Sequence, residues 1–314
     1  MRAVVLAYHE MGCAGLEALR YAGAEVLAVF THVDDPQEKR WFRSVADLAG
    51  ELRIPVLSPD RINAGEWVEQ IRALEPEMLF SFYYRQIVSR EILDIPPRGC
   101  FNLHGSLLPR YRGRSPTNWA ILEGETRTGV TLHEMEARAD TGAILAQREV
   151  PIGQDDDART VLLAQVNAAR AMLAELLPRL DAGTAPRTPQ DEQLATTFGG
   201  RRPQDGEIDW SSSARQVHDL VRAVADPFPG AFSRLAGQKC MIWKARYEKG
   251  RPSRDEAAPG SLLAATADGV LVRCGMETVE VLRAEIPPGP RLDGEELHSM
   301  FGPIPGPGFS RGGA

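Results

Sequence analysis

Short apolar runs alternate with amphipathic stretches through the first half of this chain. The runs at 2–8, 25–30, 54–57, 78–82 and 100–103 have the length and composition of buried strands. Helical spacing of apolar residues separates several of them, at 11–22, 40–52 and 66–74. Repeated β–α–β units require a mostly parallel sheet with helices on both faces. The sequence therefore predicts a Rossmann-like α/β domain, whose functional sites lie at the carboxyl ends of its strands.

The second half follows a different pattern. A helical stretch at 157–177 is expected to end at Pro178, and the polar segment up to residue 202 is rich in Gly and Pro. Short strand-like runs flanked by turn residues then indicate a small β-barrel. These features predict a first domain at 1–189, a linker at 190–202, a second domain at 203–305 and a flexible tail at 306–314.

Composition narrows the class of partner. The 314 residues carry 36 Lys+Arg against 43 Asp+Glu, a net charge of -7, and neither half is basic. This balance argues against a nucleic-acid partner. The four cysteines form no CxxC pair, so neither a zinc site nor a disulfide framework is expected. We find no signal peptide and no apolar run long enough for a membrane span, and expect a cytoplasmic protein without a metal.

Phosphate-binding motifs are incomplete. A dinucleotide site requires G-x-G-x-x-G after the first strand, but here only Gly12 and Gly15 follow it. A P-loop sequence is also missing from the chain. We interpret the two glycines as positions where a helix packs closely, in preference to a nucleotide site.

The segment 101–119 (FNLHGSLLPRYRGRSPTNW) has the composition of a functional loop. Asn102 and His104 are two residues apart, so both point to one face of an extended strand. Gly105 then allows a sharp turn, and three arginines follow at 110, 112 and 114. The alternative is a hydrogen-bonded loop histidine with surface arginines.

A second polar cluster lies at 131–142 (TLHEMEARADTG). His133 alternates with apolar residues and is interpreted as a strand residue. Asp140 precedes Thr141 and Gly142 in a turn, where an aspartate usually serves the turn itself. It gains a catalytic interpretation only if it meets His104, because a carboxylate beside an imidazole fixes its tautomer and favours its charged form.

The run from Asn102 to Pro109, with Tyr111, Arg112, Gly113 and then Asp140, resembles the folate-dependent formyltransferases. The resemblance covers nearly the whole chain, and Asp226–Ala231 is similar to the family's Pro-aromatic-Pro-Gly turn. It implies a catalytic Rossmann-like domain followed by an OB-like barrel. The co-substrate it implies is N10-formyltetrahydrofolate, with a primary amine as acceptor.

The resemblance also implies residue roles. Asn102 donates its amide N–H to the tetrahedral oxyanion, and His104 transfers the proton of the attacking amine. Asp140 orients His104 and raises its pKa. The residues expected to bind folate, partly through their backbone, are Gln86, Ile87, Val88, Arg114, Glu136, Ala137, Arg138, Ala139 and Asp140.

Within the family, four runs are most similar to the branch that formylates UDP-4-amino-4-deoxy-L-arabinose for lipid A modification and polymyxin resistance. They are 7–13 (AYHEMGC), 81–85 (SFYYR), 102–108 (NLHGSLL) and 221–227 (VRAVADP). In that branch a dehydrogenase domain is fused, so we expect a stand-alone transferase here and a separate protein for the oxidative step. For the uracil and diphosphate, Tyr111, Arg112 and Arg201 are candidates.

Three alternatives remain open: a methionyl-tRNA formyltransferase, a formyltransferase for another amino-sugar nucleotide, and a non-catalytic folate-binding protein. The tRNA enzymes carry a basic insertion after the second strand. Here that region, 32–43 (HVDDPQEKRWFR), is short and opens acidic. Because RNA affinity depends on neutralising phosphates, this segment favours a sugar amine over a tRNA as the acceptor.

Overall fold

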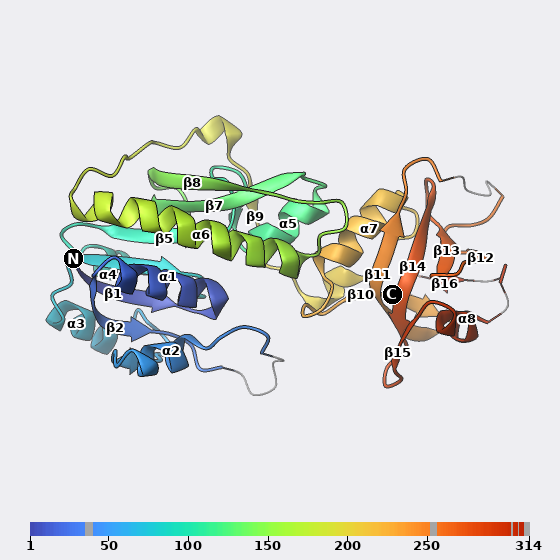
Figure 1. Ribbon diagram of the computed structural model, residues 1–314, viewed down its shortest axis with the longest axis horizontal. Helices are drawn as coiled ribbons and strands as arrows, with labels where there is room; N and C mark the ends of the chain where they lie inside the picture. Colours follow the sequence, from blue (N-terminus) through green and yellow to red (C-terminus); the bar gives the residue numbers. More distant parts are fainter. Residues whose placement is uncertain (35–39, 252–255, 303, 307, 311–314) are drawn as a thin grey trace. The chain divides into compact units, whose positions relative to one another are not determined.

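The computed structural model of the chain describes residues 1–34, 40–251, 256–302, 304–306 and 308–310. Backbone contacts divide it into two units. The first comprises Met1–Pro116, Arg127–Pro151 and Leu162–Gly199, and the second comprises Thr117–Thr126, Ile152–Val161 and Gly200–Ala314. Figure 1 shows the elements of each unit in sequence colours.

A seven-stranded sheet in the order β3-β2-β1-β4-β5-β7-β8 forms the centre of the first unit. Its strands are β1 (Arg2–Ala7), β2 (Glu25–Phe30), β3 (Val56–Leu57), β4 (Met78–Phe82), β5 (Cys100–His104), β7 (Arg127–Glu134) and β8 (Ile144–Pro151). Strands β1 to β5 pair in parallel, whereas β7 and β8 extend the sheet antiparallel. The expected α/β class with a mostly parallel sheet is confirmed.

Helices cover both faces of this sheet. They are α1 (His9–Tyr21), α2 (Val45–Glu51), α3 (Gly65–Ala73), α4 (Arg90–Leu93) and α6 (Ala158–Asp181). Because successive side chains of a strand point to opposite faces, β1 contributes to two cores. Ala3, Val5 and Ala7 pack with α1, α2 and α6. Val4 and Leu6 pack on the other side with α3 and α4.

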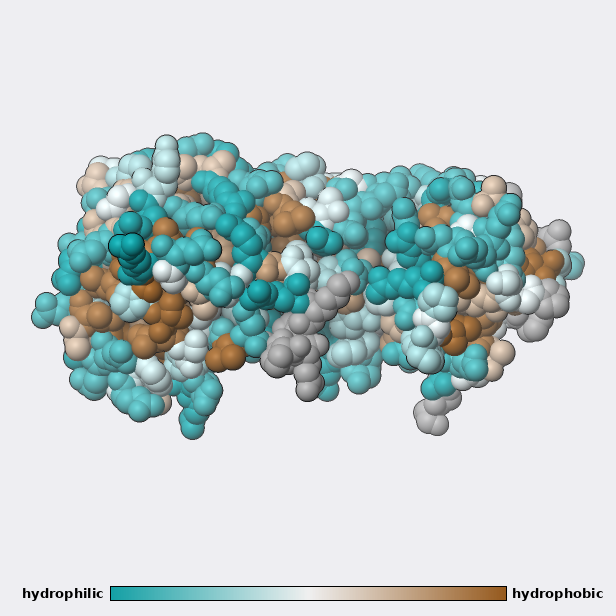
Figure 2. Space-filling model, turned by 60° about the horizontal axis from the view of Figure 1, so that its bottom comes forward, coloured by the Kyte–Doolittle hydropathy of each residue, from teal (hydrophilic) through white to brown (hydrophobic). Residues whose placement is uncertain are grey.

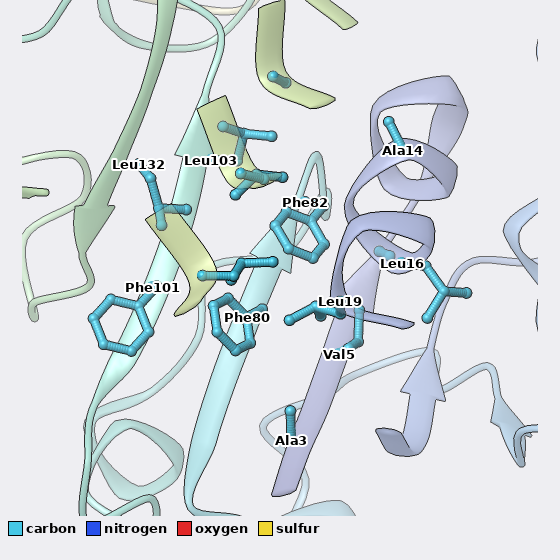
Figure 3. Packing of buried hydrophobic residues seen from close by; sticks show 14 of the residues in the cluster. Ala3, Val5, Ala14, Leu16, Leu19, Phe80, Phe82, Phe101, Leu103 and Leu132 are labelled. Carbon is cyan, nitrogen blue, oxygen red and sulfur yellow. The ribbon is translucent and has the colours of Figure 1, made fainter. Parts of the chain in front are cut away.

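The core under α1 is dense in aromatic side chains. Phe80, Phe82 and Phe101 lie side by side across β4 and β5, and Leu19 of α1 lies beside Phe80 (Figure 3). A Cβ at Gly15 would collide with the ring of Phe82. The interpretation of Gly15 as a close-packing position is confirmed.

Two predicted helices have different limits in the structure. Helix α2 begins only at Val45, because Ser44 caps it by accepting a hydrogen bond from the Asp47 N–H. Helix α6 continues through Pro178 to Asp181. The proline lacks only its own N–H, and burial of Leu177 and Leu180 keeps the last turn in place.

Helix α6 is also the one described helix long and apolar enough to cross a membrane by length and composition. This differs from the expectation that no apolar run of the chain is long enough for a membrane span. Val166, Ala169, Leu173 and Leu176 of this helix lie in the core on the sheet, so its apolar character is that of a core helix. Figure 2 shows hydrophilic side chains over much of the face in view, with hydrophobic side chains in separate patches.

An antiparallel sheet in the order β12-β13-β14-β11-β10-β16 forms the second unit, with β15 beside β14. Its elements are α7 (Ala214–Ala223), β10 (Ala231–Leu235), β11 (Gln238–Tyr247), β12 (Leu262–Ala265), β13 (Val270–Arg273), β14 (Thr278–Glu285), β15 (Arg291–Asp293), α8 (Glu296–Phe301) and β16 (Phe309–Ser310). Bulges in β11 bend the sheet, and Leu262 at one edge bridges Gly306 near the other. This curled sheet confirms the expected OB-like barrel.

The two units of the structure do not coincide with the predicted domains at 1–189 and 203–305. Residues 117–126, which include most of helix α5 (Pro116–Leu122), and 152–161 belong to the second unit. They pack on α7: Asn118 donates to the carbonyl of Ala223, and Arg222 donates to the carbonyls of Gly153 and Asp156.

Two segments expected to be irregular are held in place. In the predicted linker 190–202, strand β9 (Thr197–Phe198) pairs in parallel with β6 (Arg112–Gly113). In the predicted tail 306–314, Phe309 is only 6% exposed, stacks on Trp210 and donates its N–H to the Gly260 carbonyl. Within the predicted tail, residues 308–310 are thus packed, while residues 307 and 311–314 lie outside the described residues.

Candidate active site

Strand β5 brings two polar side chains to the carboxyl end of the sheet. Asn102 pairs across the ladders with Ser81 of β4 and His133 of β7, and His104 ends the strand opposite Thr131. The loop that follows is anchored from β7, because the Thr131 hydroxyl donates to the Ser106 carbonyl at 2.6 Å. Local β-structure therefore fixes the backbone beneath both side chains.

His104 is buried, with 6% of its surface exposed. Its Nε2 lies 2.7 Å from the carbonyl oxygen of Tyr111, which only accepts, so Nε2 carries a hydrogen. Its Nδ1 lies 3.5 Å from Oδ1 of Asp140. The imidazole is thus held between a carbonyl and a carboxylate.

Asp140 closes the site from the loop between β7 and β8. Its backbone has φ 58°, a left-handed conformation that aspartate tolerates. The N–H of Gly113 donates to its Oδ2 at 2.9 Å, and Gln190 Nε2 donates to its main-chain carbonyl at 2.9 Å. The turn aspartate of the sequence analysis does meet His104.

Two opposing effects set the pKa of His104. Burial lowers the pKa of His104 by more than the charge of Asp140 and the Tyr111 carbonyl raise it. Asp140 therefore raises the pKa of His104 as expected, but desolvation outweighs this contribution and the net shift is downward. Burial would raise the pKa of Asp140, but neighbouring His104 and His133 and the Gly113 N–H hold it well below its usual range.

Asn102 faces Asp140 and His133 together. Its Nδ2 lies 3.4 Å from Asp140 Oδ1 and 3.1 Å from His133 Nε2. The structure thus brings Asn102, His104 and Asp140 into one cluster. It adds His133, which is 1% exposed and which the sequence analysis treated as an ordinary strand residue. The only available signal was its register opposite Asn102, which a single sequence does not give.

The residues expected to bind folate lie in two loops. Gln86 is used structurally, since its side chain accepts from the Ile62 N–H and donates to the carbonyls of Pro59 and Asp60. Ile87 is 66% exposed, and its carbonyl accepts from Asn63. Among the described residues, the N–H and C=O groups of Gln86 and Val88 make no backbone hydrogen bond.

The second expected loop leads into Asp140. Glu136, Ala137, Arg138 and Ala139 are exposed, and the Thr141 hydroxyl donates to the Arg138 carbonyl. The side chain of Arg114 is also exposed, while its N–H donates to the Phe198 carbonyl in the β6–β9 pair. These positions remain predictions for folate contacts.

All three candidates for the uracil and diphosphate make contacts within the protein itself. Arg112 is 2% exposed and donates to Gln190 and Glu192. Tyr111 is buried, and its ring stacks on Phe198. Arg201, in the second unit, donates to the Asp205 carbonyl, and its guanidinium lies 5.0 Å from the centroid of the Trp119 ring.

Aromatic side chains gather after β1, β2 and β4. His9 lies 3.8 Å from Phe42 between ring centroids, and His32 stacks on Tyr84 at 4.4 Å. Burial lowers the pKa of His9 to about 4. A Cβ at Gly105 would collide with the hydroxyl of Tyr83, so this aromatic group reaches the backbone beside His104. Within 32–43, residues 35–39 lie outside the described residues.

Metal ligation has no support within the described part of the chain, where no group of three His, Cys, Asp or Glu side chains has an arrangement that could hold a metal ion. The four cysteines are free and buried, and burial raises the pKa of each thiol to about 12. Such thiols are poor ligands and nucleophiles.

Comparison with known proteins places both halves of the chain. The family model described as formyl transferase matches residues 1–177, and that of the formyl transferase C-terminal domain matches residues 201–301.

Among solved structures, an N-formyltransferase from Helicobacter canadensis, in complex with folinic acid and dTDP-3-aminofucose, has a TM-score of 0.70 and 18% identity over 89% of this chain and 98% of that one. A sugar 3N-formyl transferase solved with dTDP and 5-N-formyl-THF has a TM-score of 0.68 and 17% identity, covering 90% and 97%. Methionyl-tRNA formyltransferase from Clostridium thermocellum has a TM-score of 0.55 and 17% identity, covering 80% and 95%. At these identities the structures show a shared fold, and the two family matches together show that this chain belongs to the formyl transferase family.

Proposed function

We propose that this protein transfers the formyl group of N10-formyltetrahydrofolate to the amine of an amino-sugar nucleotide. The observation that carries the proposal is the cluster of Asn102, His104 and Asp140 at the carboxyl end of β5. It lies in a chain that matches formyl transferase models over both halves. Solved relatives of the same fold that were crystallised with a folate and a nucleotide or nucleotide sugar support the substrate class.

His104 is suited to accept the proton of the attacking amine. Because its Nε2–H is donated to the Tyr111 carbonyl and its pKa is lowered by burial, the neutral ring carries its lone pair on Nδ1. Protonation at Nδ1 creates an imidazolium 3.5 Å from the Asp140 carboxylate. Asp140 therefore stabilises the charge that forms during the reaction more than the resting state.

The proposed reaction has two steps. The amine nitrogen bonds to the formyl carbon, the carbonyl becomes an oxyanion, and His104 takes one amine proton. The oxyanion then reforms the carbonyl as the bond to N10 breaks, and the proton passes to N10, which gives a formamide and tetrahydrofolate. An N–H of Asn102 donates to the oxyanion, replacing its long 3.4 Å contact to Asp140.

For the folate we propose the loops around Gln86–Val88 and Glu136–Asp140, with Arg114. The pterin ring alternates donors and acceptors along its edge. The backbone N–H and C=O groups of Gln86 and Val88, unused by other described backbone groups, suit such an edge. The exposed Ile87 side chain next to them offers an apolar contact for the ring.

As the acceptor we propose UDP-4-amino-4-deoxy-L-arabinose, for the lipid A modification that confers polymyxin resistance. Support comes from the four runs at 7–13, 81–85, 102–108 and 221–227 and from the acidic opening of 32–43. The net charge of -7 also argues against the tRNA alternative.

Mass spectrometry of the products tests this choice. Purified protein is incubated with N10-formyltetrahydrofolate and, in parallel, with UDP-4-amino-4-deoxy-L-arabinose, dTDP-3-aminofucose and aminoacylated initiator tRNA. We expect the first amine to be formylated with the highest kcat/KM. Preferred formylation of the dTDP sugar would replace the sugar assignment, and formyl-Met-tRNA as main product would refute the sugar class.

A further inference from the structure

His133 occupies a position that the Asn102–His104–Asp140 cluster does not account for. It is 1% exposed and lies directly opposite Asn102 in the antiparallel β5–β7 register. Its Nε2 is 3.1 Å from Asn102 Nδ2 and 3.5 Å from Asp140 Oδ1. A buried imidazole in contact with two of the three cluster residues calls for a role beyond strand packing.

The tautomer of His133 is fixed by its own strand. Its Nδ1 lies 2.7 Å from the Glu134 carbonyl oxygen, which only accepts, so Nδ1 carries the hydrogen. In the neutral ring, Nε2 is then a pure acceptor. It faces the amide of Asn102, and only the NH2 end of that amide can satisfy it.

This contact is the shorter of two that favour the same orientation of the Asn102 amide, at 3.1 Å against 3.4 Å to Asp140. The terminal torsion of asparagine is broad, so packing alone leaves two orientations available. With NH2 toward His133, one N–H is held by Nε2 and the other is directed at Asp140 Oδ1. In the opposite orientation the amide oxygen would face both an acceptor nitrogen and a carboxylate.

We propose that His133 is a positioning residue, which fixes the rotation of the Asn102 amide so that its second N–H is presented to the oxyanion. The inference rests on the proposed function, in which Asn102 donates to that oxyanion. It assigns His133 an effect on kcat through Asn102 and no contact with either substrate.

Two substitutions separate this role from packing. In His133→Gln, the amide oxygen can occupy the place of Nε2 and accept the Asn102 N–H. In His133→Asn, the NH2 of the shorter side chain can take the place of Nδ1–H, but no acceptor remains near Asn102.

We expect His133→Asn to lower kcat by about 10- to 100-fold with KM changed by less than about 3-fold, since an oxyanion donor is worth about 10²–10³ in kcat. His133→Gln should recover most of this loss. His298→Asn, a histidine change in the other unit, is the control and should leave kcat unchanged.

A double-mutant cycle tests the route of the effect. Because His133 acts through Asn102, His133→Asn should lower kcat no further in an Asn102→Ala background. All rates are measured with the amine that the wild-type protein formylates, so a wrong sugar does not affect the comparison. Failure of the wild type on every amine would instead refute the proposed function.

The proposal is overturned if His133→Asn retains wild-type kcat, if His133→Gln is as impaired as His133→Asn, or if the two losses add in the double mutant. If the His133→Asn protein fails to fold, the proposal is tested on the His133→Gln variant, through the side-chain NH2 signal of Asn102 in NMR. That signal should stay in place in His133→Gln, and a shift to the position of a solvent-exposed amide would contradict the role.

Discussion

Asp140 receives hydrogen bonds and charges from several directions because of one backbone conformation. At φ 58° its carboxylate points back to Gly113, His104 and Asn102. The sequence supports Asn102 and His104 through their spacing of two in a strand, and Asp140 through resemblance. It does not reveal His133, because a histidine that alternates with apolar residues has the pattern of any strand residue. Its role depends on cross-strand register, which only the fold supplies.

Asp140→Asn keeps a residue that tolerates the left-handed backbone and nearly the same volume. It removes the charge that stabilises protonated His104, so we expect kcat to fall by about 10²-fold or more with little change in melting temperature. Steady-state kinetics and thermal unfolding measure the two effects. A variant within 3-fold of wild-type kcat would contradict the role of the carboxylate.

The lowered pKa of His104 sets the expected pH dependence. A base must be neutral to accept a proton, and an ordinary histidine is half protonated at about pH 6.5. Since burial lowers the pKa of His104, its protonation should reduce kcat, measured with both substrates saturating, only below about pH 6.5. A pH–rate profile whose acid limb lies above pH 7 would disagree with this assignment.

At the scale of elements, the segment predicted to link two domains supports the site instead. Gln190 accepts from Arg112 through its Oε1 and donates through its Nε2 to the carbonyls of Asp140 and Gly142. The β6–β9 pair anchors the same segment. Polar composition with Gly and Pro indicated irregular backbone correctly, but it does not show what the polar side chains contact.

Gln190→Glu tests this support. The carboxylate still accepts from Arg112, but it places an oxygen against two carbonyls and releases the Asp140 loop. We expect kcat to fall by about 10-fold. Glu192→Gln, at an exposed side chain that also contacts Arg112, is the control and should behave like the wild type. Equal activity of both variants, measured by formyl transfer, would show that the loop does not need Gln190.

The limits of some elements follow from the apolar pattern of the sequence, whereas those of others depend on caps and packing. The limits of β2 and β4 follow from their apolar runs alone. Residues 40–44 continue an amphipathic pattern but stay outside α2, because Ser44 caps the helix later. Helix α6 passes Pro178, because buried leucines offset one missing hydrogen bond. The periodicity of apolar residues contains neither the position of a cap nor the burial of a helix end.

For the molecule as a whole, buried histidines make stability depend on pH. Burial lowers the pKa of His9 from 6.5 to about 4. Between pH 6.5 and pH 4, His9 is therefore protonated in the unfolded chain but not in the folded protein. The free energy of unfolding should therefore decrease as pH falls from about 6.5 to about 4. In His9→Asn, which suits the positive φ of this position, the decrease should be smaller. Urea unfolding at several pH values measures it, and an unchanged slope would show that His9 is not responsible.

The acidic balance of the chain and its two formyl transferase domains lead to one claim, formyl transfer to a sugar amine by a histidine base. The most direct test supplies N10-formyltetrahydrofolate with a ¹³C-labelled formyl group to wild-type protein and to His104→Ala, with UDP-4-amino-4-deoxy-L-arabinose and aminoacylated initiator tRNA together. We predict that the label appears in the sugar nucleotide with the wild type only. Label in the tRNA, or in the sugar at equal rates with both proteins, would contradict it.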